Sequence, residues 1–137
     1  MTTANAAMIE TYSGSLQRCL DRPGFLQRFY ELFLASSEEV RRKFEKTDFA
    51  SQRRALQKSL LEASWIHQPG AESIAELKKM AKVHSRTERD IKPEMYDLWL
   101  ESLIVAAKEA DPQFTPGVEA AWRGTLGKVI DFMKARY

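Results

Sequence analysis

Cysteine, glycine and proline are scarce in this sequence of 137 residues. Cys19 is the only cysteine, so the chain can form no internal disulfide and no cysteine-rich metal cluster, and a reducing compartment suits it. Six glycines and five prolines are too few for a long linker, and repeats and low-complexity tracts are absent. With 44% hydrophobic residues, the chain is predicted to fold as a single domain over residues 1–137.

Long apolar runs and charge of one sign are missing as well. No stretch approaches the roughly 18 apolar residues of a membrane span, and the N-terminal residues lack the basic and apolar pattern of a signal peptide. Lysine and arginine number 21 against 19 acidic residues, and the two signs alternate along the chain. This alternation is typical of solvated helix faces. We therefore expect a soluble, cytoplasmic protein that binds neither nucleic acid nor membranes.

The few helix-breaking residues indicate where helices begin and end. A first helix is predicted from about Ala6 to Asp21, and Pro23 suits the first turn of a second helix. The serines and glutamates of residues 36–39 are typical of the start of a short third helix, and Thr47-Asp48 is expected to open a fourth.

The second half of the chain has three more predicted helices. Residues 68–70 (Gln-Pro-Gly) should end the fourth helix, and a fifth is predicted from about Ala71 to Arg86. Pro93 and Pro116 each stand just inside the start of a long helix. Apolar residues recur every three or four positions and never alternate with period two, so the sequence predicts an all-α fold of about seven helices.

His84 lies on an apolar stripe of the fifth predicted helix. The members of this stripe recur at helical spacing and are Ile74, Leu77, Met80, Ala81 and His84. A histidine on a buried face needs partners for its ring nitrogens, either hydrogen-bonding groups or a metal ion. The stripe alone leaves both alternatives open.

Aromatic and hydrogen-bonding residues gather in the preceding helices. They would supply a flat apolar wall with two polar groups, and they are Tyr30, Phe44, Phe49, Gln52 and Leu56. One imidazole, bulky apolar groups and a few donors suit a ferrous haem that binds a gas. Spacing alone also allows a plainer interpretation, in which Tyr30 is a core residue bonded to the backbone and Gln52 is exposed.

The sequence resembles bacterial single-domain globins and the haem domain of flavohaemoglobins. The order and spacing of several short motifs carry this resemblance over nearly the whole chain: Phe29-Tyr30, Phe44, Thr47-Asp48-Phe49, Gln52-Arg53, Leu56, His84-Ser85, residues 93–96 and Ala121-Trp122. The separation of Gln52 from His84 is similar to that between the distal residue and the proximal histidine of the family. The resemblance implies a globin fold that holds haem b (iron protoporphyrin IX).

The resemblance also implies a role for each matching residue. His84 would be the proximal iron ligand, and Phe44 would stack on the porphyrin. Tyr30 and Gln52 would donate hydrogen bonds to the bound gas, whose partial negative charge they stabilise. The remaining haem contacts would come from Phe49, from Leu56 over the iron, from Ile91 and Met95 on the proximal side, and from Tyr96 near His84.

Three functions fit such a haem. The protein could bind O2, NO or CO reversibly for storage or delivery, convert nitric oxide and O2 to nitrate with electrons from a separate reductase protein, or sense a gas. A globin-fold module without haem is a fourth alternative, which Tyr30, Phe44, Gln52 and His84 together disfavour. The two C-terminal helices could also expose an apolar strip for a homodimer.

Two departures from the family limit these implications. The segment between His84 and Tyr96 is about two residues longer than in flavohaemoglobin-like relatives, and Tyr137 or its neighbours stand where those relatives place a glutamate near the proximal histidine. A peroxidase-like electronic push on the iron is therefore not expected. His67 lies about four helical turns, or roughly 22 Å, beyond Gln52. We expect it to be a surface or helix-end residue without a metal role.

Overall fold

The computed structural model describes residues 3–71 and 74–137, and these residues form seven α-helices, a short 3-10 helix and no strand. The helices are α1 (Thr3–Leu20), α2 (Phe25–Ala35), α3 (Glu38–Lys43), α4 (Phe49–Glu62), the 3-10 helix η1 (Ala63–His67), α5 (Ala75–His84), α6 (Pro93–Ala110) and α7 (Pro116–Ala135). The predicted all-α class is confirmed.

Most predicted helix starts are confirmed by their capping contacts. The Ser37 side chain accepts hydrogen bonds from the first-turn amides of α3, and the Asp48 carboxylate does the same for α4. The Thr115 hydroxyl oxygen caps α7, and Pro93 and Pro116 lie in the first turns of α6 and α7. Side-chain oxygens at these positions satisfy amides that have no partner within the helix.

Four predicted boundaries are wrong by a few residues. Helix α1 already includes Thr3, and α4 ends at Glu62, where the chain tightens into η1 before it reaches the proline. Helix α5 begins at Ala75, because Ile74 has an extended backbone, and it ends at His84, because Ser85 is extended too. Residues 72–73, which the predicted fifth helix includes, lie outside the described residues.

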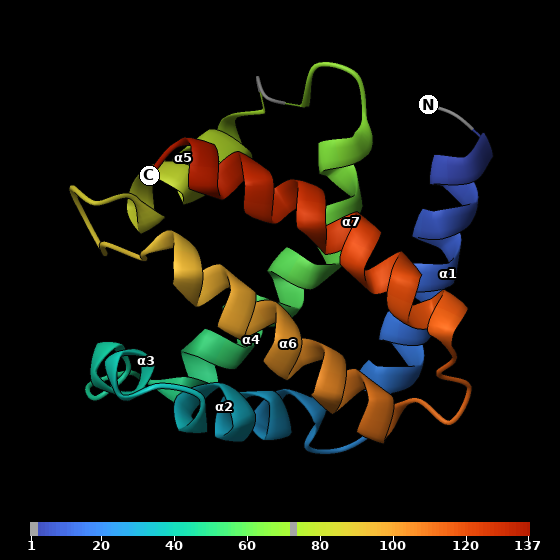
Figure 1. Cartoon of the computed structure of the whole chain (residues 1–137), viewed down its shortest axis with the longest axis horizontal. Helices are drawn as coiled ribbons and strands as arrows, with labels where there is room; N and C mark the ends of the chain where they lie inside the picture. Colours follow the sequence, from blue (N-terminus) through green and yellow to red (C-terminus); the bar gives the residue numbers. More distant parts are fainter. Residues whose placement is uncertain (1–2, 72–73) are drawn as a thin grey trace.

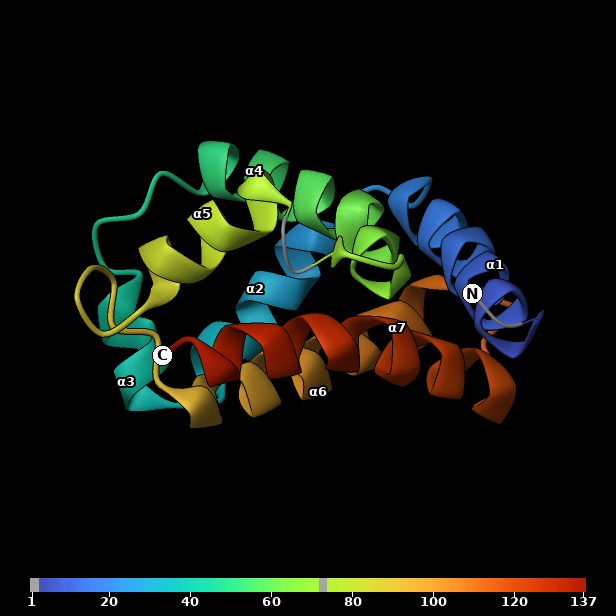
Figure 2. The same cartoon turned by 90° about the horizontal axis from the view of Figure 1, so that it is seen from above.

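The helices lie in two layers. Figure 2 shows α4 and α5 on one side of the molecule and α6 and α7 on the other, with α2 between them. Figure 1 shows α1 beside the first half of α7, while the last turns of α7 reach α5. The two ends of α7 therefore contact different helices.

Buried side chains form two separate apolar clusters, which we call the main core and the small core. The main core draws residues from α1, α2, α4, α6 and α7 and includes Tyr12, Leu16, Phe29, Leu60, Leu103 and Trp122. The small core joins α5 to the end of α7 and consists of Ile66, Ala71, Leu77, Ala81, Phe132 and Met133.

A chain of hydrogen bonds runs through the main core. The Trp122 indole N–H donates to Ser15 Oγ at 2.9 Å, and the Ser15 hydroxyl donates to Asp111 Oδ2 at 2.6 Å. Arg18 Nε donates to Asp111 Oδ1 at 2.7 Å. Burial alone would raise the pKa of Asp111, but hydrogen bonds from Arg18, Ser15 and the Gln113 amide outweigh it, so this pKa lies below its usual value. The network fixes α1 against the start of α7.

Cys19 lies inside the main core and is 0% exposed. Its Sγ is 3.8 Å from the carbonyl oxygen of Ala107 in α6. Burial raises the pKa of the Cys19 thiol to about 12, and the negative charge of Asp111 acts in the same direction. The thiol is therefore protonated at neutral pH.

No helix among residues 3–71 and 74–137 combines the length and the apolar character that a membrane crossing needs.

Candidate functional site

Three aromatic side chains predicted for the site contact one another. Tyr30 projects from α2, Phe44 follows α3, and Phe49 is the first residue of α4. The ring centroid of Tyr30 lies 5.5 Å from that of Phe49 and 6.0 Å from that of Phe44, and the Phe44 and Phe49 rings stack at 6.3 Å. The corner between α3 and α4 therefore presents an aromatic wall beside Tyr30.

The structure brings Tyr30 and Gln52 together. The Tyr30 hydroxyl, on a residue only 5% exposed, donates to the backbone carbonyl of Gln52 at 3.5 Å. Burial raises the pKa of Tyr30 to about 12, against the opposing effects of a hydrogen bond with the Gln52 side chain and the positive charge of Arg53. The phenol is therefore protonated at neutral pH and can donate. Leu56, one helical turn after Gln52, is also buried.

His84 is the last residue of α5 and is half-buried. Its Nδ1 lies 2.7 Å from the carbonyl oxygen of Met80, one turn earlier in the same helix. A carbonyl can only accept a hydrogen bond, so Nδ1 carries the proton and Nε2 keeps its lone pair. Burial lowers the pKa of His84, and the charge of Arg89 adds to this effect, while the Met80 bond opposes it. The neutral imidazole therefore has one nitrogen suited to a metal ion.

The predicted site residues are divided between the two cores. Tyr30, Leu56 and Met95 belong to the main core, and Phe44, Phe49 and Ile91 pack against it. The helix that ends at His84 contributes Leu77 and Ala81 to the small core, with Met80 and Tyr96 packed against that core. Among the described residues, no hydrogen bond or ring contact joins His84 to Tyr30 or Gln52. The residues on the tyrosine side of the predicted site thus contact one another, whereas His84 ends a helix that packs in the small core.

The loop after His84 is held by the end of the chain. The Ile91 amide donates to the His84 carbonyl at 3.0 Å, which folds the loop back onto the end of α5. The Tyr137 hydroxyl bonds to the Asp90 carboxylate, and the Arg86 amide donates to the Tyr137 carbonyl at 3.1 Å. Tyr137 therefore fixes the loop, and the described partner of the His84 ring is a neutral carbonyl.

His67 corrects one prediction. It ends η1, as expected of a helix-end residue, but it is buried, so the alternative of a surface position is wrong. Its Nε2 lies 3.1 Å from the carbonyl oxygen of Thr125 in α7. The sequence could not show this burial because the partner is a backbone carbonyl on a distant helix.

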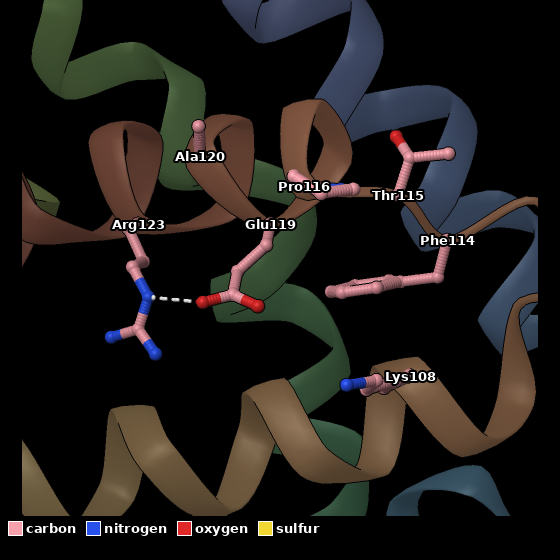
Figure 3. Close-up of a pocket in the computed structure, with 7 residues that line it drawn as sticks. All are labelled: Lys108, Phe114, Thr115, Pro116, Glu119, Ala120 and Arg123. Atoms are coloured by element: carbon pink, nitrogen blue, oxygen red, sulfur yellow. Dashed lines mark hydrogen bonds and ion pairs between the residues drawn. The ribbon is translucent and has the colours of Figure 1, made fainter.

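Two hollows on the surface are lined by other residues. One, of about 310 Å³, lies between α6 and the start of α7 and is lined by Lys108, Phe114, Glu119 and Arg123 among others. Figure 3 shows Arg123 turned toward Glu119, and the two form an ion pair at 2.9 Å. The other, of about 420 Å³, lies between the α1–α2 turn and α4. Neither hollow includes Tyr30, Gln52 or His84.

Sequence reasoning missed two contributors to the site. The Met80 carbonyl sets which nitrogen of His84 is protonated, and the charge of Arg53 acts on the Tyr30 hydroxyl. Helical spacing was the available signal for the first, because Met80 stands four residues before His84. For Arg53 the signal was its position next to Gln52.

Comparisons with known proteins agree with the resemblance seen in the sequence. The family model described as Globin matches residues 27–133. A Pseudomonas aeruginosa protein, described as structurally highly homologous to a human haemoglobin, superposes with a TM-score of 0.89 at 33% identity. The match covers 95% of this chain and 98% of that protein. The search of curated proteins finds no match.

Proposed function

This chain belongs to the globin family, whose members generally bind haem, and from that premise we propose that it binds a diatomic gas reversibly at a haem held by His84. Haem b would supply a ferrous iron with one open position for O2, NO or CO. The protein side of the proposal is the arrangement of donors and apolar groups described above.

The state of the His84 ring carries the proposal. Its Nδ1–H is engaged by the Met80 carbonyl at 2.7 Å, so Nε2 is left as an unprotonated ligand atom. A ring held in this way is oriented before a metal ion binds, which lowers the entropic cost of ligation. The neutral acceptor makes the imidazole less electron-donating than a carboxylate would, which favours gas binding over peroxidase-like chemistry.

Tyr30 and Gln52 would supply hydrogen-bond donors to the bound gas. A phenol O–H and an amide N–H would each stabilise the partial negative charge on a bound gas by about 1–3 kcal/mol. In the present structure the phenol donates to the Gln52 backbone, a long bond that a stronger acceptor would replace. Breaking this hydrogen bond when a gas binds would therefore cost little free energy.

Apolar side chains of both cores would surround the haem. We propose that the flat macrocycle contacts the main core through Phe44, Phe49, Leu56, Ile91 and Met95, and the small core near Tyr96. The bound haem would thereby bury apolar surface of both cores.

A haemin titration tests the ligand assignment. The wild-type chain should develop a Soret band with one equivalent of haemin, and His84→Ala should lose it or show a strongly shifted, weak band. His67→Gln is the matched control, because it removes the other histidine and retains an N–H donor for the Thr125 carbonyl. An unchanged spectrum of His84→Ala would refute His84 as the ligand.

Gas release tests the donors separately. Tyr30→Phe and Gln52→Leu should each raise the O2 dissociation rate by about 5- to 150-fold, which corresponds to the loss of 1–3 kcal/mol. Tyr12→Phe is the control, since it removes a buried hydroxyl that donates to Leu60 and should leave gas release unchanged. If Tyr30→Phe and Tyr12→Phe have the same O2 dissociation rate, Tyr30 does not face the gas.

A second candidate function is the conversion of nitric oxide and O2 to nitrate, with a separate reductase protein as the electron source. The pairing of Tyr30 with Gln52 favours it, because two donors would hold O2 long enough for a second gas to react. Sustained nitric oxide consumption over many turnovers, with a reductase and a nicotinamide donor present, would support this function. If each protein molecule reacts with nitric oxide only once, this second function is refuted and reversible gas binding remains.

A further inference from the structure

The hollow between the α1–α2 turn and α4 is lined by three arginines and by no acidic residue. Arg22 comes from the turn, while Arg53 and Arg54 come from the first half of α4. Its volume of about 420 Å³ lies within the range of small-molecule sites. Residues far apart in the sequence therefore gather positive charge around one concave surface.

These guanidinium groups lack the carboxylate partners that other arginines have. Arg28 pairs with Glu109 at 2.8 Å, and Arg41 pairs with Glu38 at 2.6 Å. In the part of the chain that the structure describes, no salt bridge involves Arg22, Arg53 or Arg54. Arg54 donates to Ser51 Oγ at 3.1 Å and lies near enough to Asp48 to lower the pKa of that carboxyl, so it is the least free of the three.

Polar and backbone groups extend the same surface. Gln27, Gln57 and Gly24 also line the hollow, and the φ of Gly24 is 85°. A Cβ at Gly24 would meet nothing within 4 Å, so the backbone there is open to a ligand. The first turn of α2 has no side-chain cap, and its amides add partial positive charge to that of the arginines.

We propose that this hollow is a binding site for a small soluble phosphate ester, with the phosphoryl group on Arg22, Arg53 and Arg54. The planar guanidinium fork matches phosphate oxygens two at a time, and three guanidinium groups outside any salt bridge around one hollow favour a dianion over a single carboxylate. The glutamine amides would bind the polar part of the molecule beyond the phosphate. None of the proposed haem contacts lines this hollow, although the charge of Arg53 also acts on the Tyr30 hydroxyl.

Calorimetric titration of the full chain with sodium pyrophosphate tests this proposal, at a constant ionic strength of about 0.1 M so that general screening is fixed. Saturable binding of one equivalent is expected. Arg22→Gln and Arg53→Gln should each weaken binding about tenfold, because each removes a charge-assisted bond. The triple variant with Arg54→Gln should not bind.

Lys128→Gln is the matched control, because it removes one positive charge from α7, outside the hollow. It should bind pyrophosphate as the wild type does, and far-ultraviolet circular dichroism should show that all variants are equally helical. The proposal is overturned if the triple variant still binds, if Lys128→Gln weakens binding as much as Arg53→Gln, or if vesicles of phosphatidylglycerol bind while pyrophosphate does not.

Discussion

The main core and the small core are built in different ways. In the main core, Trp122 is fully buried, contacts Tyr12 edge to face at 5.0 Å, and starts the hydrogen-bond chain that reaches Asp111. The small core consists of a few aliphatic groups with Phe132, and the described residues include no ring pair or buried ion pair within it. The main core thus combines several packed aromatic rings with a buried hydrogen-bond chain, while Phe132 is the one aromatic residue among the buried residues of the small core.

This difference bears on the site, because the predicted haem residues lie on both cores. The tyrosine side is fixed by a large cluster, whereas α5 is attached through the small core and the loop contacts of Tyr137. We expect the histidine side to open at lower free energy than the rest of the chain and to gain the most from a bound ligand.

The largest effect is expected from Trp122→Ala. Removing a fully buried indole from the main core should lower the free energy of unfolding by about 4 kcal/mol. Urea denaturation followed by circular dichroism measures this loss. Trp65→Ala is the control, because Trp65 is 37% exposed, and its variant should lose far less. Equal losses would show that the main core is not the stable half.

Asp111→Ala should cost about 3 kcal/mol at neutral pH, since it removes a fully buried carboxylate that accepts several hydrogen bonds. The native pKa of Asp111 lies below its ordinary value of 3.8. Its stabilisation is therefore complete above about pH 4 and is lost as the pH falls through the lower native pKa. The difference between the urea midpoints of wild type and variant should be smaller at pH 3 than at pH 6. Asp131→Asn changes an exposed carboxyl and should leave the midpoint at pH 6 nearly unchanged.

In the small core, Leu77→Ala should cost about 2 kcal/mol, near the low end for a buried leucine, because the surrounding groups can close the space. Hydrogen exchange should show faster opening of α5 with little change in α2 and α6. Leu61→Ala, at a position 53% exposed, provides the comparison. Uniform acceleration throughout the chain would show that the two cores unfold as one unit.

The smallest expected effect is a gain in stability rather than a loss. The Thr125 hydroxyl is buried and finds no hydrogen-bond partner among the described residues. Thr125→Val removes this unsatisfied group and retains the shape, so thermal unfolding should show a gain of about 1 kcal/mol. The exposed Thr11→Val should be neutral. A loss at Thr125 would mean that a water molecule satisfies the hydroxyl.

Local signals in the sequence predicted most of the fold. Ser37, Asp48, Pro93 and Pro116 act within one helical turn, so their caps could be recognised without any tertiary contact. The end of α4 was missed because no breaker stands near Glu62, and the change to η1 depends on packing against α7.

The candidate site was predictable only in part. Helical spacing and the family resemblance singled out Tyr30, Gln52 and His84, and the structure brings the first two together. The contacts of Ser15 with Asp111 and of His67 with Thr125 join residues more than fifty positions apart, so no local pattern reveals them. Long-range partners of this kind decide burial and protonation, which is why His67 was placed partly wrongly.

The buried thiol of Cys19 gives the chain a native probe of its own motion. An alkylating reagent can reach this sulfur only when the main core opens, and the single cysteine leaves no competing signal. The rate of mass increase in excess reagent therefore measures how often that half of the molecule exposes its interior. Repeating the measurement with haemin or pyrophosphate would show which ligand slows those openings, without any substitution in the chain.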